Sequence, residues 1–254
     1  MGRSSRGPDQ PQPDVGVLLA WAAALLAVMV SLVPLVWHDA DPGPANALDR
    51  WGRRAVGAGL TRLLRDVHVA SVADRIFPRL ADMGSAREVA AVAIVLGLIG
   101  LVKRDGTALA LSVLGPLVAV AITEYAAKPL VGRVRDGAYQ YPSGHCTGAS
   151  AVGTVGVLLL WRYGGRPAVG RLGWLFIVPP VLVLVAVQRL RFHDLTESVA
   201  GLATGAGTVL AVEALRRHLS DRRRRAGRPA DRVDDRQPRP RKPAPTVTVW
   251  TSRT

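Results

Sequence analysis

The run Thr107–Ala127, with the sequence TALALSVLGPLVAVAITEYAA, decides the fold of this chain. It contains a single charged residue, Glu124. A helix that crosses a bilayer needs about 20 predominantly apolar residues, and this run has that length. Similar runs rich in Leu, Val, Ala, Ile and Gly occupy residues 15–37, 87–102, 146–161, 172–188 and 195–214. The sequence therefore predicts six transmembrane helices.

Three of these runs, 87–102, 146–161 and 172–188, are short and need flanking residues to cross a bilayer. The alternative is a soluble α-helical protein in which the runs are buried core helices. That alternative would require six core helices with almost no polar face, whereas a surface helix of a soluble protein keeps one. We therefore expect an all-α fold, namely a polytopic membrane helix bundle with six transmembrane helices.

The basic residues between the runs indicate the orientation, because short cytoplasmic joints collect Lys and Arg. With both termini in the cytoplasm, the inner joints carry Lys103 and Arg104, then Arg162, Arg166 and Arg171, then the stretch that starts at Arg216. The long outer loop 38–86 has basic residues that are nearly balanced by aspartates. Within it, Leu60, Leu63, Leu64 and Val67 recur at helical spacing. We expect a multi-pass protein of the cell membrane with an amphipathic helix on its outer surface.

Three segments follow from this topology: a cytoplasmic N-terminal segment 1–14, a six-span domain 15–215 and a tail 216–254. The tail has 13 Lys or Arg against 4 Asp, so +9 of the formal charge of +14 lies there. It has no apolar period, which predicts disorder. A basic tail beside the inner membrane face is expected to contact anionic lipid headgroups, and nucleic acid is not expected as a partner.

Basic residues and histidines gather at the predicted outer ends of the spans. The outer loop 128–145 carries Lys128, Arg133 and Arg135, followed by Pro142-Ser143-Gly144-His145 at the start of the fourth run. The outer turn 189–193 carries Arg189, Arg191 and His193, and Glu197 follows in the sixth run. Arginines at span ends often snorkel to the interface, and Ser-Gly can be an ordinary helix start. Neither explanation accounts for two histidines and a carboxylate four residues after one of them.

These residue types suit phosphoryl transfer. His193 and Glu197 are neighbours if both lie on one helix, since side chains at i and i+4 share a face. A carboxylate on one imidazole nitrogen makes the other nitrogen a better nucleophile. Ser143 and the amide of Gly144, at a helix N-terminus, predict an anion site, and Lys and Arg side chains can balance phosphoryl charge. His145 can protonate the departing oxygen, so a phosphohistidine mechanism needs no metal and no cofactor.

Two further features concern positioning. Glu124 lies four residues before Lys128, so the two can pair on a helix and the carboxylate can hold the lysine in place. A purely structural pair is the alternative. Gly201, Gly205 and Gly207 in the sixth run are expected to allow close helix packing.

The three clusters together resemble the signature of the type 2 phosphatidic acid phosphatase superfamily, which includes bacterial lipid phosphate phosphatases. Its first part, Lys, six residues and Arg-Pro, is matched by Lys128 and Arg135, with Asp136 in place of the proline. Its second part, Pro-Ser-Gly-His, is complete at 142–145. In the third part His193 is present, Glu197 stands where the family has Asp, and Val187 stands where the family has Arg. The resemblance covers about residues 85–215.

The resemblance implies a role for each matching residue. His193 would be the nucleophile, Glu197 would orient it, and His145 would be the general acid. Phosphate would be bound by Lys128, Arg135, Ser143 and the amide of Gly144, with Arg133 as the alternative to Arg135. The arginine of the third part would be either Arg189 or Arg191.

We therefore expect a metal-independent lipid phosphate phosphatase whose site faces outward. Its substrate would be a polyprenyl pyrophosphate, phosphatidic acid or phosphatidylglycerophosphate. One alternative is a lipid phosphotransferase that uses the same phosphohistidine and passes the group to a hydroxyl. Another is a six-span protein without enzymatic activity that binds anionic lipid.

Overall fold

The computed structural model describes residues 13–37, 46–135 and 137–226. Most of the predicted segment 1–14 and residues 38–45 of the outer loop thus lie outside the described residues. The chain divides into two compact units, Met1–His218 and Leu219–Thr254, and the features discussed below belong to the first unit except where α10 is followed to its end.

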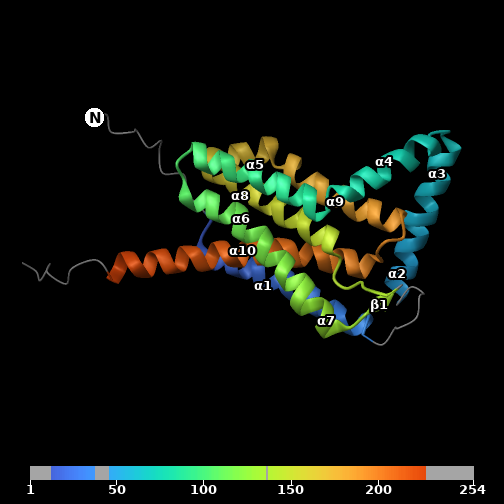
Figure 1. Ribbon diagram of the computed structural model, residues 1–254, viewed down its shortest axis with the longest axis horizontal. Coiled ribbons are helices and arrows are strands. Elements are labelled where there is room, and N and C mark those ends of the chain that lie inside the picture. Colours follow the sequence, from blue (N-terminus) through green and yellow to red (C-terminus); the bar gives the residue numbers. More distant parts are fainter. Residues whose placement is uncertain (1–12, 38–45, 136, 227–254) are drawn as a thin grey trace, which may run out of the picture. The chain divides into compact units, whose positions relative to one another are not determined.

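The described residues fold mainly into helices (Figure 1). In chain order the elements are α1 (Val15–Leu32), the 3-10 turn η1 (Val33–Leu35), α2 (Ala47–Gly52), the π-helical segment η2 (Arg53–Gly59), α3 (Leu60–Asp66), α4 (Ala70–Asp82), α5 (Ala86–Val102), α6 (Gly106–Ala121), the π-helical segment η3 (Ile122–Ala127), α7 (Lys128–Val131), β1 (Val134–Arg135), β2 (Ala138–Tyr139), α8 (Gly144–Leu172), α9 (Trp174–Arg189) and α10 (Leu195–Ala226). All six predicted apolar runs fall on helices, which confirms the all-α class apart from one small hairpin.

Several of these helices have the length and composition of membrane spans. Among the described residues, four segments are long and apolar enough: Val15–Leu35, Gly106–Val131, Gly144–Leu172 and Leu195–Arg223. The pair α4 and α5 would form a fifth span with a bend of 61°. Helix α9 is apolar but has only 16 residues, fewer than the roughly 20 that a straight span needs. The chain is a helical multi-pass membrane protein, and six as its number of spans stays a prediction.

Short polar side chains set where several helices begin. Asp105 accepts hydrogen bonds from the backbone of Thr107 and Ala108, both at 3.1 Å, and so caps α6. Ser85 caps α5 and Ser143 caps α8 in the same way. Caps of this kind satisfy backbone N–H groups that the first turn leaves without partners.

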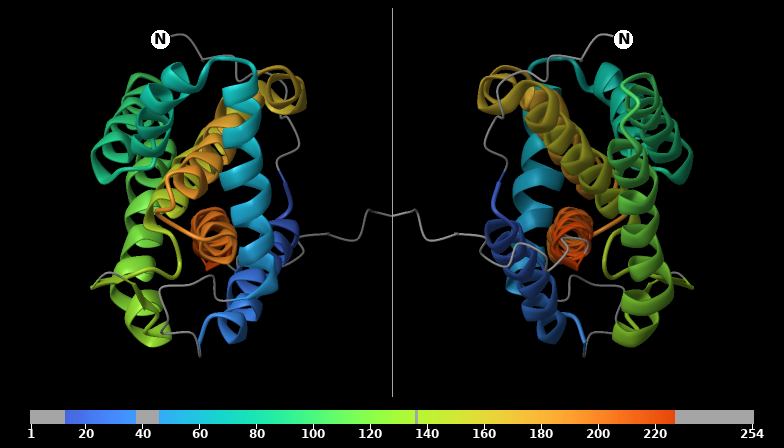
Figure 2. Two further views of the ribbon diagram at one scale, coloured as in Figure 1. Left: turned by 90° about the vertical axis from the view of Figure 1, so that its right-hand side faces the viewer. Right: turned by 90° about the vertical axis from the view of Figure 1, so that its left-hand side faces the viewer.

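Small residues bring α10 against its neighbours. Figure 2 shows the orange-red α10 nearly end-on, with α1, α6 and the cyan helices α2 and α3 drawn around it. A methyl group at Gly201 would lie 2.5 Å from the carbonyl oxygen of Ser143, and one at Gly205 would overlap the carbonyl of Thr147. One at Gly207 would press on α1 at Leu25 and Leu26, about as tightly as real contacts allow. The predicted packing role of the three glycines is confirmed.

The outer loop carries helices, as its apolar spacing predicts. Leu60, Leu63 and Leu64 lie on α3, and Val67 follows its last residue. The loop also contains α2, η2 and α4, and α4 packs against α9. The placement of this segment on the outer membrane surface stays a prediction.

The predicted start of the disordered tail requires a correction. Helix α10 continues to Ala226, so residues 216–226 are helical. The helix persists past the apolar run because Glu213 pairs with Arg216 at 2.7 Å and with Arg217 at 2.6 Å, at the i+3 and i+4 spacings that favour a helix. Residues 227–254, for which disorder and lipid contact are also predicted, lie outside the described residues.

Candidate active site

A tight hairpin between α7 and α8 carries two arginines toward the start of α10. Gly132 ends α7 with φ at 68°, a left-handed conformation that costs glycine nothing. Strands β1 and β2 then pair antiparallel, with Val134 opposite Tyr139. Side chains alternate between the two faces along a strand, so Arg133 and Arg135 point to the same side. Both arginines are buried.

The carboxylate of Glu197 is held on three sides. Its Oε2 lies 3.1 Å from Nδ1 of His193 and accepts a hydrogen bond from the backbone N–H of Asp194 at 2.9 Å. Its Oε1 accepts a hydrogen bond from Nε of Arg133 at 2.7 Å. The predicted contact between His193 and Glu197 is present, although His193 precedes α10 instead of lying on it. Because Nδ1 is occupied, Nε2 is the nitrogen left for a reacting group.

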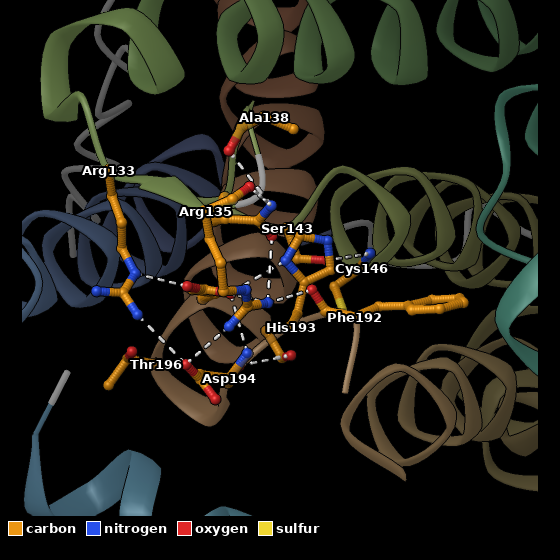
Figure 3. Close-up of polar contacts among 12 residues, drawn as sticks. Arg133, Arg135, Ala138, Ser143, Cys146, Phe192, His193, Asp194 and Thr196 are labelled. Carbon is orange, nitrogen blue, oxygen red and sulfur yellow. Dashed lines mark hydrogen bonds and ion pairs between the residues drawn. The ribbon is translucent and has the colours of Figure 1, made fainter. Parts of the chain in front are cut away.

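Asp194 is the centre of a buried cluster of charges. It forms a two-point ion pair with Arg53, at 2.6 and 2.9 Å, and further pairs with Arg133 at 3.3 Å and Arg135 at 3.1 Å. Figure 3 shows Arg133 and Arg135 converging on it. A buried carboxylate without partners costs several kcal/mol, so three guanidinium groups make its burial tolerable.

The two arginines of the hairpin have different surroundings. The side chain of Arg133 is 1% exposed and lies between Glu197 and Asp194. Arg135 also contacts Asp194, donates to the carbonyl oxygen of Phe192 and lines the main cavity of the site. Between the two predicted phosphate ligands, the geometry therefore favours Arg135. Arg133 supports the acid behind His193 instead.

Arg189 and Arg191 also differ in their surroundings. Arg189 donates to Asp74 at 3.2 Å and lies over the ring of Phe77, with 5.9 Å between the guanidinium carbon and the ring centre. Arg191, which adopts a left-handed conformation with φ at 59°, lines the cavity. Of the two arginines in the turn 189–193, Arg191 is therefore the one that lines the cavity.

The sequence Pro-Ser-Gly-His builds the start of α8. Ser143 is completely buried; its hydroxyl accepts a hydrogen bond from the N–H of Cys146 and its own N–H donates to the carbonyl of Glu197. Ser143 is not among the described residues that line the cavity, so the contact of its hydroxyl with phosphate stays a prediction. Gly144 and His145 line the cavity, as predicted.

The cavity has a volume of about 680 Å³ and combines charged and imidazole side chains with an apolar wall. Its charged or imidazole lining consists of Glu124, Lys128, Arg135, His145, Arg191 and His193. The rings of His145 and His193 are 6.3 Å apart between centroids, which leaves room for one phosphoryl group between them. Nζ of Lys128 donates to Oε1 and Oε2 of Glu124 at 2.7 and 2.8 Å, so the predicted pair is present.

Sequence reasoning missed α2 and the start of η2 as part of this site. Asp49 accepts hydrogen bonds from the N–H and the hydroxyl of Thr196, at 2.8 and 2.9 Å, and Arg53 holds Asp194. The pKa of Asp49 lies above its ordinary value, mainly because the carboxyl group is buried. The negative charges of Asp194 and Glu197 also raise this pKa, whereas the hydrogen bonds from Thr196 lower it. The only sequence signal was that loop 38–86 balances its charges, which does not reveal long-range pairs.

The described residues contain no group of three or more His, Cys, Asp or Glu side chains placed to hold a metal ion. The cationic side chains that line the cavity are of the kind that binds anions. The arrangement can bind a phosphoryl group, present an oriented imidazole to it and supply a second imidazole for proton transfer.

The fold of this chain is similar to that of a protein with a solved structure. No family model matches the chain, and no curated protein matches it. The chain is similar to the crystal structure of the first transmembrane PAP2 type phosphatidylglycerolphosphate phosphatase from Bacillus subtilis, with 15% sequence identity and a TM-score of 0.61. The similarity covers 79% of this chain and 98% of that one. This chain has the fold of a PAP2-type membrane phosphatase.

Proposed function

We propose that this protein is a lipid phosphate phosphatase that works through a phosphohistidine at the outer membrane face. The observation that carries the proposal is the pair of His193 and Glu197. Nδ1 of His193 is fixed by a fully buried carboxylate, and the same imidazole lines a cavity with Lys128, Arg135 and Arg191. An oriented nucleophile beside several cations is what phosphoryl transfer requires.

In the first step, Nε2 of His193 attacks phosphorus and the bond from phosphorus to the lipid oxygen breaks. The leaving oxygen takes a proton from the imidazolium of His145 across the gap between the two rings. Glu197 stabilises the positive charge that develops on His193. The products of this step are phosphohistidine and the free lipid alcohol or, with a pyrophosphate substrate, the lipid monophosphate.

In the second step, a water molecule attacks phosphorus and gives its proton to His145, which is now neutral. The phosphorus–nitrogen bond breaks, inorganic phosphate leaves, and both histidines return to their starting states. Lys128, Arg135 and Arg191 hold the non-bridging oxygens throughout, because these cations line the cavity.

A groove beside the cavity supports a lipid as the substrate. It has a volume of about 340 Å³, is lined entirely by apolar residues of α5 and α6, and shares Ala86, Val89 and Val120 with the charged cavity. Its other lining residues are Ala90, Ala93, Ile94, Val113, Pro116 and Leu117. A phosphate in the cavity could therefore have its hydrocarbon chain in the groove, where burial of apolar surface is favourable.

The proposal includes an orientation. The turn between α5 and α6, with Lys103 and Arg104, lies at the end of the first unit remote from β1 (Figure 1). A cytoplasmic location for that turn follows the positive-inside rule and puts the cavity on the outer side. Under this orientation both termini are cytoplasmic, and the basic tail can contact anionic headgroups of the inner leaflet.

The test is phosphate release by the purified protein in proteoliposomes, with a chelator present. The panel contains phosphatidic acid, phosphatidylglycerophosphate, a polyprenyl pyrophosphate and water-soluble glycerol phosphate. We expect release from at least one lipid, much slower release from glycerol phosphate, and none from the His193→Ala variant. Transfer to added glycerol in place of release would identify a phosphotransferase. No release from any lipid, or full activity of His193→Ala, would overturn the proposal.

A further inference from the structure

We propose that the outer segment Asn46–Arg53, called the outer clamp below, positions the catalytic pair, with Arg53 as a positioning residue that acts through Asp194. The clamp comes from the helices before the predicted second span, far in sequence from the residues it holds. The inference rests on the proposed function, because it assigns a role relative to His193.

The outer clamp contacts the start of α10 at two points. Asp49 accepts hydrogen bonds from the N–H and the hydroxyl of Thr196, and so caps α10 with a residue 147 positions away. Gly52 lies so close to α10 that a methyl group there would be 2.9 Å from both Leu195 Cβ and Gln188 Oε1. The backbone of the clamp therefore packs directly on the turn that carries His193.

Arg53 adds the third point of contact. Its Nε and one terminal nitrogen donate to the two carboxylate oxygens of Asp194, at 2.6 and 2.9 Å. Two parallel bonds of this kind fix orientation as well as distance. The side chain of Arg53 is 33% exposed whereas that of Asp194 is 2% exposed, so the pair links the surface to the buried cluster.

A continuous series of contacts leads from Arg53 to the nucleophile. Asp194 pairs with Arg133, Arg133 pairs with Glu197, and Glu197 holds Nδ1 of His193. The cluster has equal numbers of each charge: Arg53, Arg133 and Arg135 against Asp49, Asp194 and Glu197. Loss of Arg53 would leave it with one excess negative charge in surroundings where charge interactions are strong.

Arg53 is absent from the described residues that line the cavity, so it makes no direct contact with a bound phosphoryl group there. Its removal should therefore lower kcat and leave KM nearly unchanged. A shift of about 1 Å at a reacting group can cost on the order of 100-fold in rate, so we expect kcat to fall by about 10- to 100-fold for Arg53→Ala.

The matched control is Arg54→Ala, which removes the same charge one residue later, from an exposed side chain of η2 that lies outside the outer clamp. It should leave kcat and KM at wild-type values. Arg53→Lys keeps the charge but cannot form two parallel bonds, and we expect partial activity. Guanidinium ions at millimolar concentration should restore part of the activity of Arg53→Ala, because the vacated space opens to solvent.

The pH profile separates positioning from a loss of folding. His193 must be neutral to attack, so the acid limb of kcat/KM reports when it loses its proton. Removing the positive charge of Arg53 favours the protonated imidazole, so the limb should move to higher pH. Asp194→Asn removes a negative charge and should move it to lower pH. The ionisable groups that face His193 and stay unchanged in the Arg53 variants are Glu124, Lys128, Arg133, Arg135, His145, Arg191, Asp194, Glu197 and, around His145, Asp82.

The same shift should appear without turnover. Diethyl pyrocarbonate reacts with an imidazole only when that imidazole is neutral. Peptide mass spectrometry can therefore follow the modification of His193 against pH in wild type, Arg53→Ala and Arg54→Ala. We expect a higher midpoint for Arg53→Ala alone. Equal kcat and equal midpoints for Arg53→Ala and Arg54→Ala would overturn the inference while an active wild type keeps the proposed function. An inactive wild type would overturn the proposed function, and the midpoints would still decide whether Arg53 controls His193.

Discussion

Nε of Arg133 donates to Oε1 of Glu197 at 2.7 Å, and both side chains are shielded from solvent. An arginine in the predicted phosphate-binding loop thus contacts the carboxylate that holds Nδ1 of His193. The neighbouring Arg135 instead faces the cavity. Under the proposed function, Arg133 would hold Glu197 in place and Arg135 would bind the substrate, so loss of each arginine should have a different kinetic effect.

Arg135→Gln should mainly raise KM, because it removes a cation from the cavity wall. Arg133→Lys should mainly lower kcat, since a lysine keeps the charge but cannot contact both Glu197 and Asp194 as a guanidinium does. Steady-state kinetics on one lipid phosphate checks both variants, with the melting temperature as a control for folding. An unchanged KM for Arg135→Gln together with a raised KM for Arg133→Lys would reverse the assignment.

Glu197→Gln should lower kcat by about 100- to 10,000-fold, because the amide keeps the shape of the side chain but loses the charge that stabilises an imidazolium on His193. The matched control is Glu213→Gln, which changes another buried acid of α10 that pairs with two arginines at a distance from the cavity. Turnover of the control should equal that of wild type. Similar losses in both variants would point to a general effect on α10.

The helices and the pairs at short sequence separation were predictable from the sequence. Six apolar runs gave six helices, and the spacing of His193 and Glu197, and of Glu124 and Lys128, gave contacts that the structure contains. The six helices and the pair of Glu124 and Lys128 depend on helix geometry and on the cost of exposing apolar surface, which are local properties. The contact of His193 with Glu197 is also local, although His193 precedes α10.

The supports of the site were not predictable in the same way. The pair of Arg53 and Asp194 joins residues 141 positions apart, and no local pattern selects Arg53 from the other arginines of its loop. The choice of Arg135 and Arg191 over Arg133 and Arg189 depends on where two tight turns direct the side chains. The sequence also does not show that Ser143 lies outside the cavity lining and that its hydroxyl caps α8.

His145→Ala should affect substrates according to their leaving group. With a lipid alkoxide the rate should fall by about 100- to 10,000-fold, since the general acid is lost. With a nitrophenyl phosphate the loss should be much smaller, because nitrophenolate leaves without a proton. Equal losses with both substrates would show that His145 is not the proton donor.

Gly201→Ala should destabilise the fold and reduce activity. The added methyl group would meet the Ser143 carbonyl at 2.5 Å and Cys146 Cβ at 2.9 Å, so α10 and the start of α8 must separate. Overpacking of this kind costs about 1–3 kcal/mol. Gly170→Ala is the control, because nothing lies within 4 Å of its added methyl group, and its melting temperature should not fall. Equal melting temperatures for the two variants would contradict the close contact.

The ion pair between Asp105, at the start of α6, and Arg162 of α8 should make stability depend on pH. Burial raises the pKa of Asp105, but hydrogen bonds from Arg162 and from the backbone of Ala108 and Thr107 lower it, and the result lies below the ordinary value of 3.8. A carboxyl group whose pKa is lower in the folded state stabilises the fold fully above its unfolded pKa, and this contribution is lost as the pH falls through the folded pKa. Asp105→Asn keeps the helix cap, since Asn caps as well as Asp, and removes the charge.

At pH 7 the Asp105→Asn variant should therefore melt below wild type, by the equivalent of about 1 kcal/mol or less for a pair that is only partly buried. Below about pH 4, where an unfolded aspartate takes up its proton, the difference between the two melting temperatures should shrink. The comparison is between the two proteins at each pH, because other carboxylates titrate in both. A difference that stays constant from pH 7 to pH 3 would mean that the charge of Asp105 does not stabilise the contact with Arg162.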